Sequence, residues 1–237
     1  MSTYFLVHGA WVGAWSWEKV VPLLEAKGHK VKTVDLPGHG MDKTPINEVT
    51  LQAYADKVCQ ALDKLDGQVI LVGHSMGGIV ISQAAEARPN KVEKLVYLAA
   101  YLLENGETMM QVAQEDQSSM LGQNIVLSDD GVYVTAIEES IKTVHFPDST
   151  DEDVARVKGL IGLQPTAPFA APIKITEENY GRIPRIYIEC TNDLVISPAA
   201  QKTMYTKMPC EQVLSLESSH TPNYGSPDKL VEQLIKC

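Results

Sequence analysis

The sequence predicts an α/β fold in which a mostly parallel, doubly wound sheet carries an inserted cap. Three observations predict it. Short β-branched runs alternate with helical patterns, as they do in βα units. A Gly-His-Ser-Met-Gly turn joins one of these strands to a helix. A stretch of roughly eighty residues then interrupts the alternation and shows no pattern of a buried parallel strand.

Six short apolar segments are expected to form the sheet. Between the second and the third, apolar residues recur at three- and four-residue steps, which predicts an amphipathic helix over Thr50–Leu65. A helix between two strands lets them lie parallel. The predicted strands are Tyr4–Val7, Lys30–Asp35, Val69–Val72, Leu95–Ala99, Arg185–Cys190 and Gln212–Leu216.

The interruption is predicted to be a cap over the sheet. It contains a helical pattern over Asp151–Leu163 and a Pro-rich segment at Gln164–Pro172. The expected core therefore comprises residues 1–101 and 182–237, and the expected cap comprises residues 102–181.

Composition limits the classes of partner. A chain of 237 residues fits one domain with an insertion. Its net charge of −10 opposes binding to nucleic-acid backbones and to anionic membrane surfaces, so neither is expected as a partner. The four cysteines form no CxxC pair and show no metal-ligand spacing, and no dinucleotide fingerprint is present. We therefore expect reduced thiols, no metal and no cofactor.

Two segments bear on location. The first apolar run, Tyr4–Val7, has no basic segment before it and is too short for a secretory signal, so a cytoplasmic location is expected. Residues Gly67–Ala85 carry no Asp, Glu, Lys or Arg and are long enough to span a bilayer. Their interior glycines and polar residues instead favour a buried strand, a tight turn and a buried helix.

The turn between that strand and helix has the G-x-S-x-G pattern. In this context the serine of the pattern sits on a sharp, strained turn with its hydroxyl accessible, which makes Ser75 a candidate nucleophile. Gly73 and Gly77 supply the small neighbours that the turn requires. The alternative is a glycine-rich turn with an incidental serine. The glycines fit neither of the common phosphate-binding patterns.

A nucleophilic serine needs a histidine base that is oriented by a carboxylate, and behind this turn the chain order is Ser, Asp or Glu, His. Asp193 follows a predicted strand, and His220 follows the next one. Glu189 is the rival acid, but it lies within the strand. Asp193 as an exposed turn residue and His220 as a solvated loop histidine remain alternatives. Local hydrogen bonding is expected for the other histidines, which are His8, His29, His39, His74 and His145.

Backbone amides are expected to stabilise the developing oxyanion. The donors would be the N–H of Met76, directly after the nucleophile, and the N–H of Ala10, in the loop after the first strand. Gly9 allows substrate to approach the backbone closely. An adaptable apolar pocket for small to medium uncharged acyl groups is also expected. The residues expected to line it are Trp11, Leu102, Leu103, Met109, Met120, Leu121, Leu160, Leu163 and Phe169, with Gly9 and Met76 beside the nucleophile. The alternative is that these side chains form the core of the cap.

On these residues the chain resembles an α/β-hydrolase of the plant methylesterase and hydroxynitrile lyase group and its bacterial esterase relatives. The resemblance runs nearly end to end. It is carried by HGAWVGAWSWEKVVPLLEAKGHKVKTVDLPGHG, VILVGHSMGG, NYGRIPRIYIECTNDLVISPAAQ and the ESSH segment. It implies the α/β-hydrolase fold and a homodimer. It also implies Ser75 as nucleophile, Asp193 and His220 as its partners, and the amides of Ala10 and Met76 as the oxyanion hole.

Two departures from that group narrow the expected reaction. Its hydroxynitrile lyases are similar but place a lysine directly after the histidine and a threonine at the position of Gly9, whereas Thr221 follows His220 here. The charge that would stabilise cyanide is therefore missing. The sequence predicts a cofactor-independent carboxylic ester hydrolase that acts on a small-molecule ester through an acyl-enzyme. Another cleavage on the same scaffold (C–C, amide or lactone) or a ligand receptor remains open.

Overall fold

A computed structural model describes all 237 residues of the chain, and a six-stranded sheet forms its centre. Every pairing in this sheet is parallel, and the strand order is β2-β1-β3-β4-β8-β9. All six predicted strands are present, although β4 begins three residues earlier than predicted. The strands are β1 (Thr3–Val7), β2 (Lys30–Val34), β3 (Val69–His74), β4 (Val92–Leu98), β8 (Arg185–Cys190) and β9 (Gln212–Leu216).

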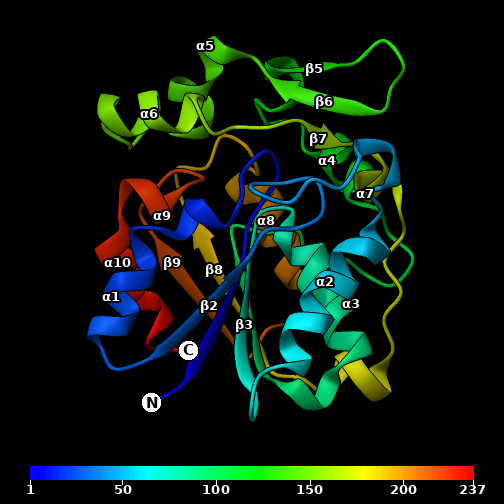
Figure 1. Cartoon of the computed structure of the whole chain (residues 1–237), viewed down its shortest axis with the longest axis vertical. Coiled ribbons are helices and arrows are strands. Elements are labelled where there is room, and N and C mark those ends of the chain that lie inside the picture. Colours follow the sequence, from blue (N-terminus) through cyan, green and yellow to red (C-terminus); the bar gives the residue numbers. More distant parts are fainter.

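Helices cover both faces of the sheet, and the alternation of side chains along each strand divides the core between them (Figure 1). In β1, Tyr4 and Leu6 pack with one set of helices, whereas Phe5 and Val7 pack with the other. The first set is α1 (Val20–Ala26) and α10 (Pro227–Leu234); the second is α2 (Leu51–Asp63), α3 (Gly77–Ala87) and α8 (Pro198–Lys207). The predicted doubly wound fold is therefore confirmed.

The helix predicted over Thr50–Leu65 is present as α2. Thr50 is its N-cap, because the Thr50 hydroxyl accepts a hydrogen bond from the backbone N–H of Ala53 at 3.0 Å. The apolar positions that predicted the helix face the sheet, and Tyr54, Val58 and Leu62 are fully buried there.

The segment between β4 and β8 forms an upper layer over the carboxyl edge of the parallel sheet (Figure 1). It contains a small antiparallel sheet that periodicity did not predict, because its strands are only two to four residues long: β5 (Ile125–Leu127), β6 (Tyr133–Ala136) and β7 (Gln164–Pro165). The helix predicted over Asp151–Leu163 is too long. It ends at Lys158, where Gly159 is the C-cap.

The remaining elements are short. Those of the upper layer are α4 (Met109–Glu115), α5 (Glu138–Ser140), α6 (Asp151–Lys158), α7 (Ala167–Ala170), the 3₁₀ turn Gly122–Asn124, and the π-helical turns Ile141–His145 and Glu177–Gly181. Those beside the core are α9 (Pro222–Gly225) and the 3₁₀ turns Ala14–Trp17, Ile46–Glu48 and Pro89–Lys91.

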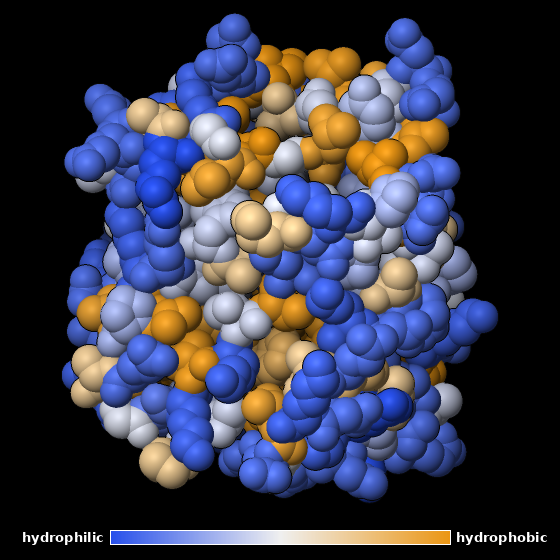
Figure 2. Space-filling view, in the orientation of Figure 1, coloured by the Kyte–Doolittle hydropathy of each residue, from blue (hydrophilic) through white to orange (hydrophobic).

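None of the helices combines the length and the apolar composition that a membrane-spanning segment requires. Most of the face in Figure 2 is polar, and apolar side chains gather over the upper layer, where Val126 and Leu127 are exposed.

Candidate active site

Ser75 occupies the tight turn between β3 and α3 in a strained backbone conformation. Its φ of +55° lies in the left-handed region, which side chains other than glycine rarely adopt. Backbone hydrogen bonds hold it there: Ser75 N donates to Leu98 O at 3.2 Å, and Ser75 O accepts from Gly78 N at 3.0 Å and from Tyr101 N at 3.2 Å. The strain is thus maintained by the neighbouring strand and helix, as expected where the fold presents one functional side chain.

The glycines on either side of Ser75 are required by close backbone contacts. A Cβ atom on Gly73 would lie 2.6 Å from the carbonyl oxygen of Gly77. A Cβ atom on Gly77 would lie 2.9 Å from the carbonyl oxygens of both Val7 and His8. Because these neighbours are backbone atoms, they cannot rotate away.

We expect Gly77→Ala to destabilise the protein by about 1–3 kcal/mol, because an added methyl group here must displace the backbone of β1 and the loop after it. Urea unfolding measures the change. Gly122→Ala is the matched control, since a Cβ atom there meets nothing within 4 Å, and its effect should stay within about 0.5 kcal/mol. Equal stabilities of the two variants would contradict this account of the turn.

Asp193 and His220 form a buried pair. His220 Nδ1 lies 2.7 Å from Asp193 Oδ2, and both residues are buried. The carboxylate also accepts hydrogen bonds from the backbone N–H groups of Val195 (2.7 Å) and Ile196 (3.0 Å) and from the side chain of Gln201 (3.2 Å). These bonds fix the carboxylate, so that the imidazole donates from Nδ1 and presents Nε2 as an acceptor.

Glu189, the rival acid, is engaged elsewhere. Its carboxylate accepts hydrogen bonds from the hydroxyls of Tyr205 at 3.0 Å and Ser215 at 2.6 Å. It makes no contact with His220 that would orient the imidazole.

Two backbone N–H groups beside Ser75 have no acceptor within the chain. They belong to Ala10 and Met76, which are both buried. Buried N–H groups are almost always paired, so two free ones near one serine indicate a site for a negatively charged oxygen.

Four of the other histidines make the expected local hydrogen bonds. His8 contacts Gly9 O and Leu36 N, His29 accepts from Ser2 N, and His39 contacts Tyr54. His74 Nε2 donates to the carbonyl oxygen of His220 at 2.8 Å and so helps to position that loop.

His145 departs from that expectation. Its side chain is buried but Nε2 has no hydrogen-bond partner. Burial is the main cause that lowers the pKa of His145 to about 4, and the positive charge that His220 can carry is the smaller one, so the ring is neutral at pH 7.

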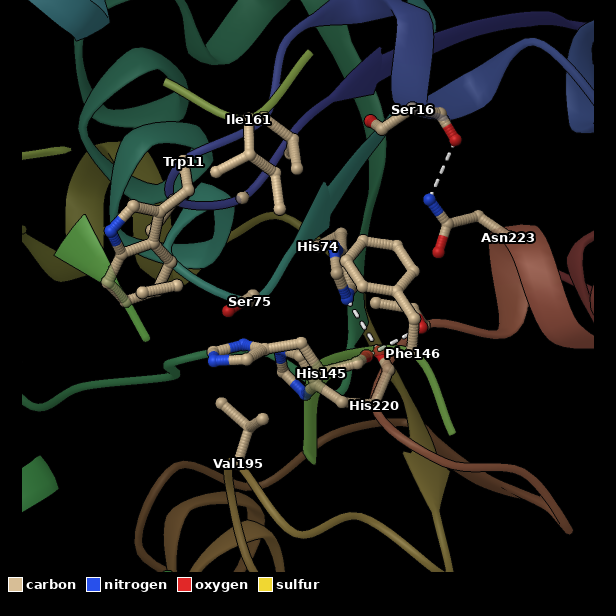
Figure 3. Close-up of a pocket in the computed structure, with 15 residues that line it drawn as sticks. Trp11, Ser16, His74, Ser75, His145, Phe146, Ile161, Val195, His220 and Asn223 are labelled. Atoms are coloured by element: carbon tan, nitrogen blue, oxygen red, sulfur yellow. Dashed lines mark hydrogen bonds between the residues drawn. The ribbon is translucent and has the colours of Figure 1, made fainter. Parts of the chain in front are cut away.

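Ser75 and His220 line one pocket of about 30 Å³ (Figure 3). The pocket also contains Gly9, Ala10 and Trp11. The structure shows no hydrogen bond between Ser75 Oγ and His220 Nε2; in proteins without substrate such catalytic hydrogen bonds often form only on binding. Met76 and Asp193 do not line the pocket; Met76 directly follows Ser75 in the chain, and Asp193 contacts His220. The fold therefore brings Ser75, His220 and Ala10, which the sequence indicated, to one pocket.

The predicted acyl-binding residues divide between several places. Trp11, Met109, Leu121 and Phe169 line a second, largely apolar pocket of about 540 Å³, in which Trp11 is the residue shared with the Ser75 pocket. The remaining candidates lie elsewhere. Leu102 is buried and lines a different pocket, and Leu103 is buried in the core. Leu160, Leu163 and Met120 are exposed and line none of these pockets.

Ser16, Asn223 and Gln201 are the site residues that sequence reasoning missed. Ser16 and Asn223 line the Ser75 pocket, and Asn223 Nδ2 donates to Ser16 O at 2.7 Å. They are 207 positions apart in the chain. No motif joins residues at that separation, so only the fold reveals the pair.

The chain matches a family model described as the alpha/beta hydrolase family over residues 4–233. It is 34% identical to putative methylesterase 11, chloroplastic, of Arabidopsis thaliana, over 98% of this chain and 63% of that protein. It is also 34% identical to a pyrethroid hydrolase of Sphingobium wenxiniae, over 97% of this chain and 85% of that protein. The chain spans 55% of putative methylesterase 13 of Arabidopsis thaliana.

Solved structures share the fold. The crystal structure of a pyrethroid hydrolase from Sphingobium faniae is similar with a TM-score of 0.88 and 32% sequence identity, covering 99% of this chain and 96% of that one. Several matched methylesterases are named chloroplastic. The cytoplasmic location therefore stays a prediction. The homodimer also stays a prediction, because the structure describes a single chain.

Proposed function

The chain belongs to the alpha/beta hydrolase family, and from that premise we propose that it hydrolyses carboxylic esters through an acyl-enzyme formed on Ser75. One observation carries this proposal: the free N–H groups of Ala10 and Met76 lie beside a strained serine and a buried Asp193–His220 pair. The methylesterase and pyrethroid hydrolase names of the relatives support ester hydrolysis.

In the first half-reaction Ser75 Oγ attacks the ester carbonyl carbon while His220 Nε2 takes the hydroxyl proton. The carbonyl oxygen becomes an oxyanion, to which the N–H groups of Ala10 and Met76 donate. The intermediate then expels the alcohol, which leaves with the proton held by His220. Asp193 keeps Nδ1 as the donor throughout and stabilises the imidazolium.

In the second half-reaction water attacks the acyl-enzyme and gives a proton to His220. The carboxylic acid leaves, and Ser75 regains its proton from the imidazole. The sum is ester plus water to acid plus alcohol, so no electron acceptor and no further co-reactant is needed. No group of three or more His, Cys, Asp or Glu residues is placed to hold a metal ion.

The apolar pocket next to Trp11 fits the acyl half of a small to medium, largely apolar ester. Its walls include Met109, Leu121 and Phe169, and apolar side chains form most of its surface. Burying a charged acyl group there without a partner would cost several kcal/mol. Monoesters of dicarboxylic acids should therefore be poor substrates.

Phe169→Ala should enlarge this pocket and raise the ratio of kcat/KM for a bulky acyl ester over a short one by about tenfold, the scale of about one methylene group in a hydrophobic pocket. Steady-state rates on p-nitrophenyl esters of a branched and a two-carbon acid measure the ratio. Leu160→Ala is the control, because Leu160 is exposed and lines neither pocket. If the ratio is unchanged in folded Phe169→Ala, the acyl group binds elsewhere.

Hydroxynitrile cleavage is not supported by the residues beside His220. The Thr221 hydroxyl donates to the carbonyl oxygen of His145 at 2.8 Å, and neither Lys nor Arg lines the pocket. A departing cyanide ion would therefore lack a cation to stabilise it.

A further inference from the structure

Trp11, which directly follows the oxyanion donor Ala10, has a strained backbone. Its φ of +62° lies in the left-handed region, where a side chain this bulky is a clear outlier. The loop that carries it lies against the nucleophile, since a Cβ atom on Gly9 would lie 3.0 Å from Ser75 Cβ. Strained residues persist only where their surroundings hold them, so Trp11 needs contacts that keep this loop in place.

Those contacts come from the upper layer. The backbone N–H of Trp11 donates to Gln164 Oε1 at 3.2 Å, and its carbonyl oxygen accepts from Gly162 N at 2.8 Å. The indole Nε1 donates to the carbonyl oxygen of Val134 at 3.0 Å. Every polar group of Trp11 is therefore bonded to the segment between β4 and β8. Gln164 is the partner that acts through its side chain, so a substitution can remove its contact alone.

The Gln164 side chain is fully buried and its orientation is fixed. Its Nε2 donates to the carbonyl oxygen of Pro165 at 2.9 Å and lies 3.4 Å from the Tyr54 hydroxyl. The amide nitrogen is thereby held on that side, and Oε1 is left to accept the Trp11 N–H. Without Oε1 this buried N–H would be unpaired, and rotation of the Ala10–Trp11 peptide would relieve both the lost bond and the strain.

The direction of the Ala10 N–H depends on the two peptide planes that flank Ala10. The core fixes the first plane: one ring nitrogen of His8 accepts a backbone N–H, so its Nδ1 carries the proton and donates to Gly9 O at 2.7 Å. In a trans peptide the C=O and N–H point in opposite directions, so the Ala10 N–H points away from His8. The second plane joins Ala10 to Trp11, and Gln164 fixes it from the upper layer.

We propose that Gln164 is a positioning residue for the oxyanion hole, because its bond to the Trp11 N–H holds the loop that aims the Ala10 N–H at the oxyanion. Gln164 does not line the Ser75 pocket, so it acts through the loop and does not touch substrate. This inference rests on the proposed ester hydrolysis and adds a residue of the upper layer to its machinery. The oxyanion hole is then complete only while the upper layer contacts the core.

The test is Gln164→Met, which removes the acceptor but keeps a side chain of similar length. Its kcat should fall by about 10- to 100-fold, somewhat less than removal of a whole oxyanion donor costs, while KM stays within about threefold. A trifluoromethyl ketone that forms an oxyanionic adduct with Ser75 should bind more weakly by the same factor, because the adduct resembles the transition state. Gln164→Asn, whose amide is one methylene shorter, should show the same losses and decides the question if Gln164→Met does not fold.

Two further variants separate positioning from stability. Gln164→Glu keeps an acceptor for the Trp11 N–H, and burial favours its neutral acid, whose hydroxyl can donate to Pro165 O. Its kcat and its affinity for the ketone should stay within about threefold of the wild-type values. Ser140→Ala is the matched control, since it removes a buried hydrogen bond of the upper layer, from Ser140 Oγ to Ile137 O at 2.7 Å, that does not contact Trp11. It should lower stability in urea and leave kcat and ketone affinity unchanged.

Unchanged kcat and ketone affinity in folded Gln164→Met or Gln164→Asn would overturn the inference. Losses of equal size in Gln164→Glu or in Ser140→Ala would overturn it as well, because the bond to the Trp11 N–H would then not be their cause. In each case turnover by wild-type protein would leave the proposed hydrolysis standing. Absence of turnover by wild-type protein on every ester would instead reject that function itself.

Discussion

Ser75→Ala should lower kcat/KM for ester hydrolysis by about 10³- to 10⁶-fold while the protein stays folded. The substitution removes the attacking oxygen, and neither the histidine base nor the oxyanion hole can act without it. The Cβ atom and the backbone hydrogen bonds of the turn are retained, so stability should change by no more than about 1 kcal/mol. Initial rates on an activated ester and a urea melt measure the two quantities.

A serine-directed phosphonate provides an independent check of the same assignment. The reagent should attach to Ser75 in wild-type protein, with mass spectrometry locating the adduct, and should leave Ser75→Ala unlabelled. Ser82 is a control within the next helix, because its hydroxyl is occupied by Gly78 O and by the Tyr97 hydroxyl. An adduct on Ser82, or undiminished turnover by folded Ser75→Ala, would end the proposal of an acyl-enzyme on Ser75.

The centre of the parallel sheet could be predicted from the sequence because its inner strands are buried on both faces and read as continuous apolar runs. Val69–Val72 and Leu95–Leu98 are such runs, and both are almost wholly buried. The small sheet β5–β7 could not be predicted in this way. Its strands pair over only two or three residues, which is too short for a period of two to stand out.

The chemically reactive residues could be predicted because each follows a strand at the carboxyl edge of the sheet. Ser75, Asp193 and His220 all satisfy this rule. Other residues that line the Ser75 pocket follow no such rule. Ser16 lies in a 3₁₀ turn, His145 ends a π-helical turn of the upper layer, and Asn223 lies in the short helix α9. Their convergence depends on how these elements pack, which periodicity does not encode.

The upper layer and the core make different contributions to the site. The core supplies the strained turn, the buried Asp193–His220 pair and the free amides, all of which recognise only the reacting carbonyl group. The upper layer supplies His145 to the Ser75 pocket and Leu121 and Phe169 to the apolar pocket. Substrate choice should therefore change with substitutions in the upper layer, whereas the reaction type should change only with substitutions in the core.

Asp193→Asn should lower kcat by about 10⁴-fold, the scale that loss of the imidazole's orienting carboxylate produces in serine hydrolases. In wild-type protein Asp193 Oδ2 accepts from His220 Nδ1, while Val195, Ile196 and Gln201 supply the other hydrogen bonds to the carboxylate. Because the two N–H bonds hold Oδ1, the amide nitrogen of Asn would take the place of Oδ2. It would then donate to Nδ1, place the ring proton on Nε2, and leave no lone pair to accept the proton of Ser75.

Glu189→Gln is the matched control for this substitution, because it makes the same chemical change in the rival acid, which bonds only to Tyr205 and Ser215. Its kcat should stay within about twofold of the wild-type value, since a surface hydrogen bond lost there affects stability by less than about 1 kcal/mol. Rates of both variants on one ester, with circular dichroism to verify folding, give the comparison. A large loss in Glu189→Gln together with near-normal kcat in Asp193→Asn would transfer the role of the acid to Glu189, and equal, small losses in both would show that neither carboxylate orients His220.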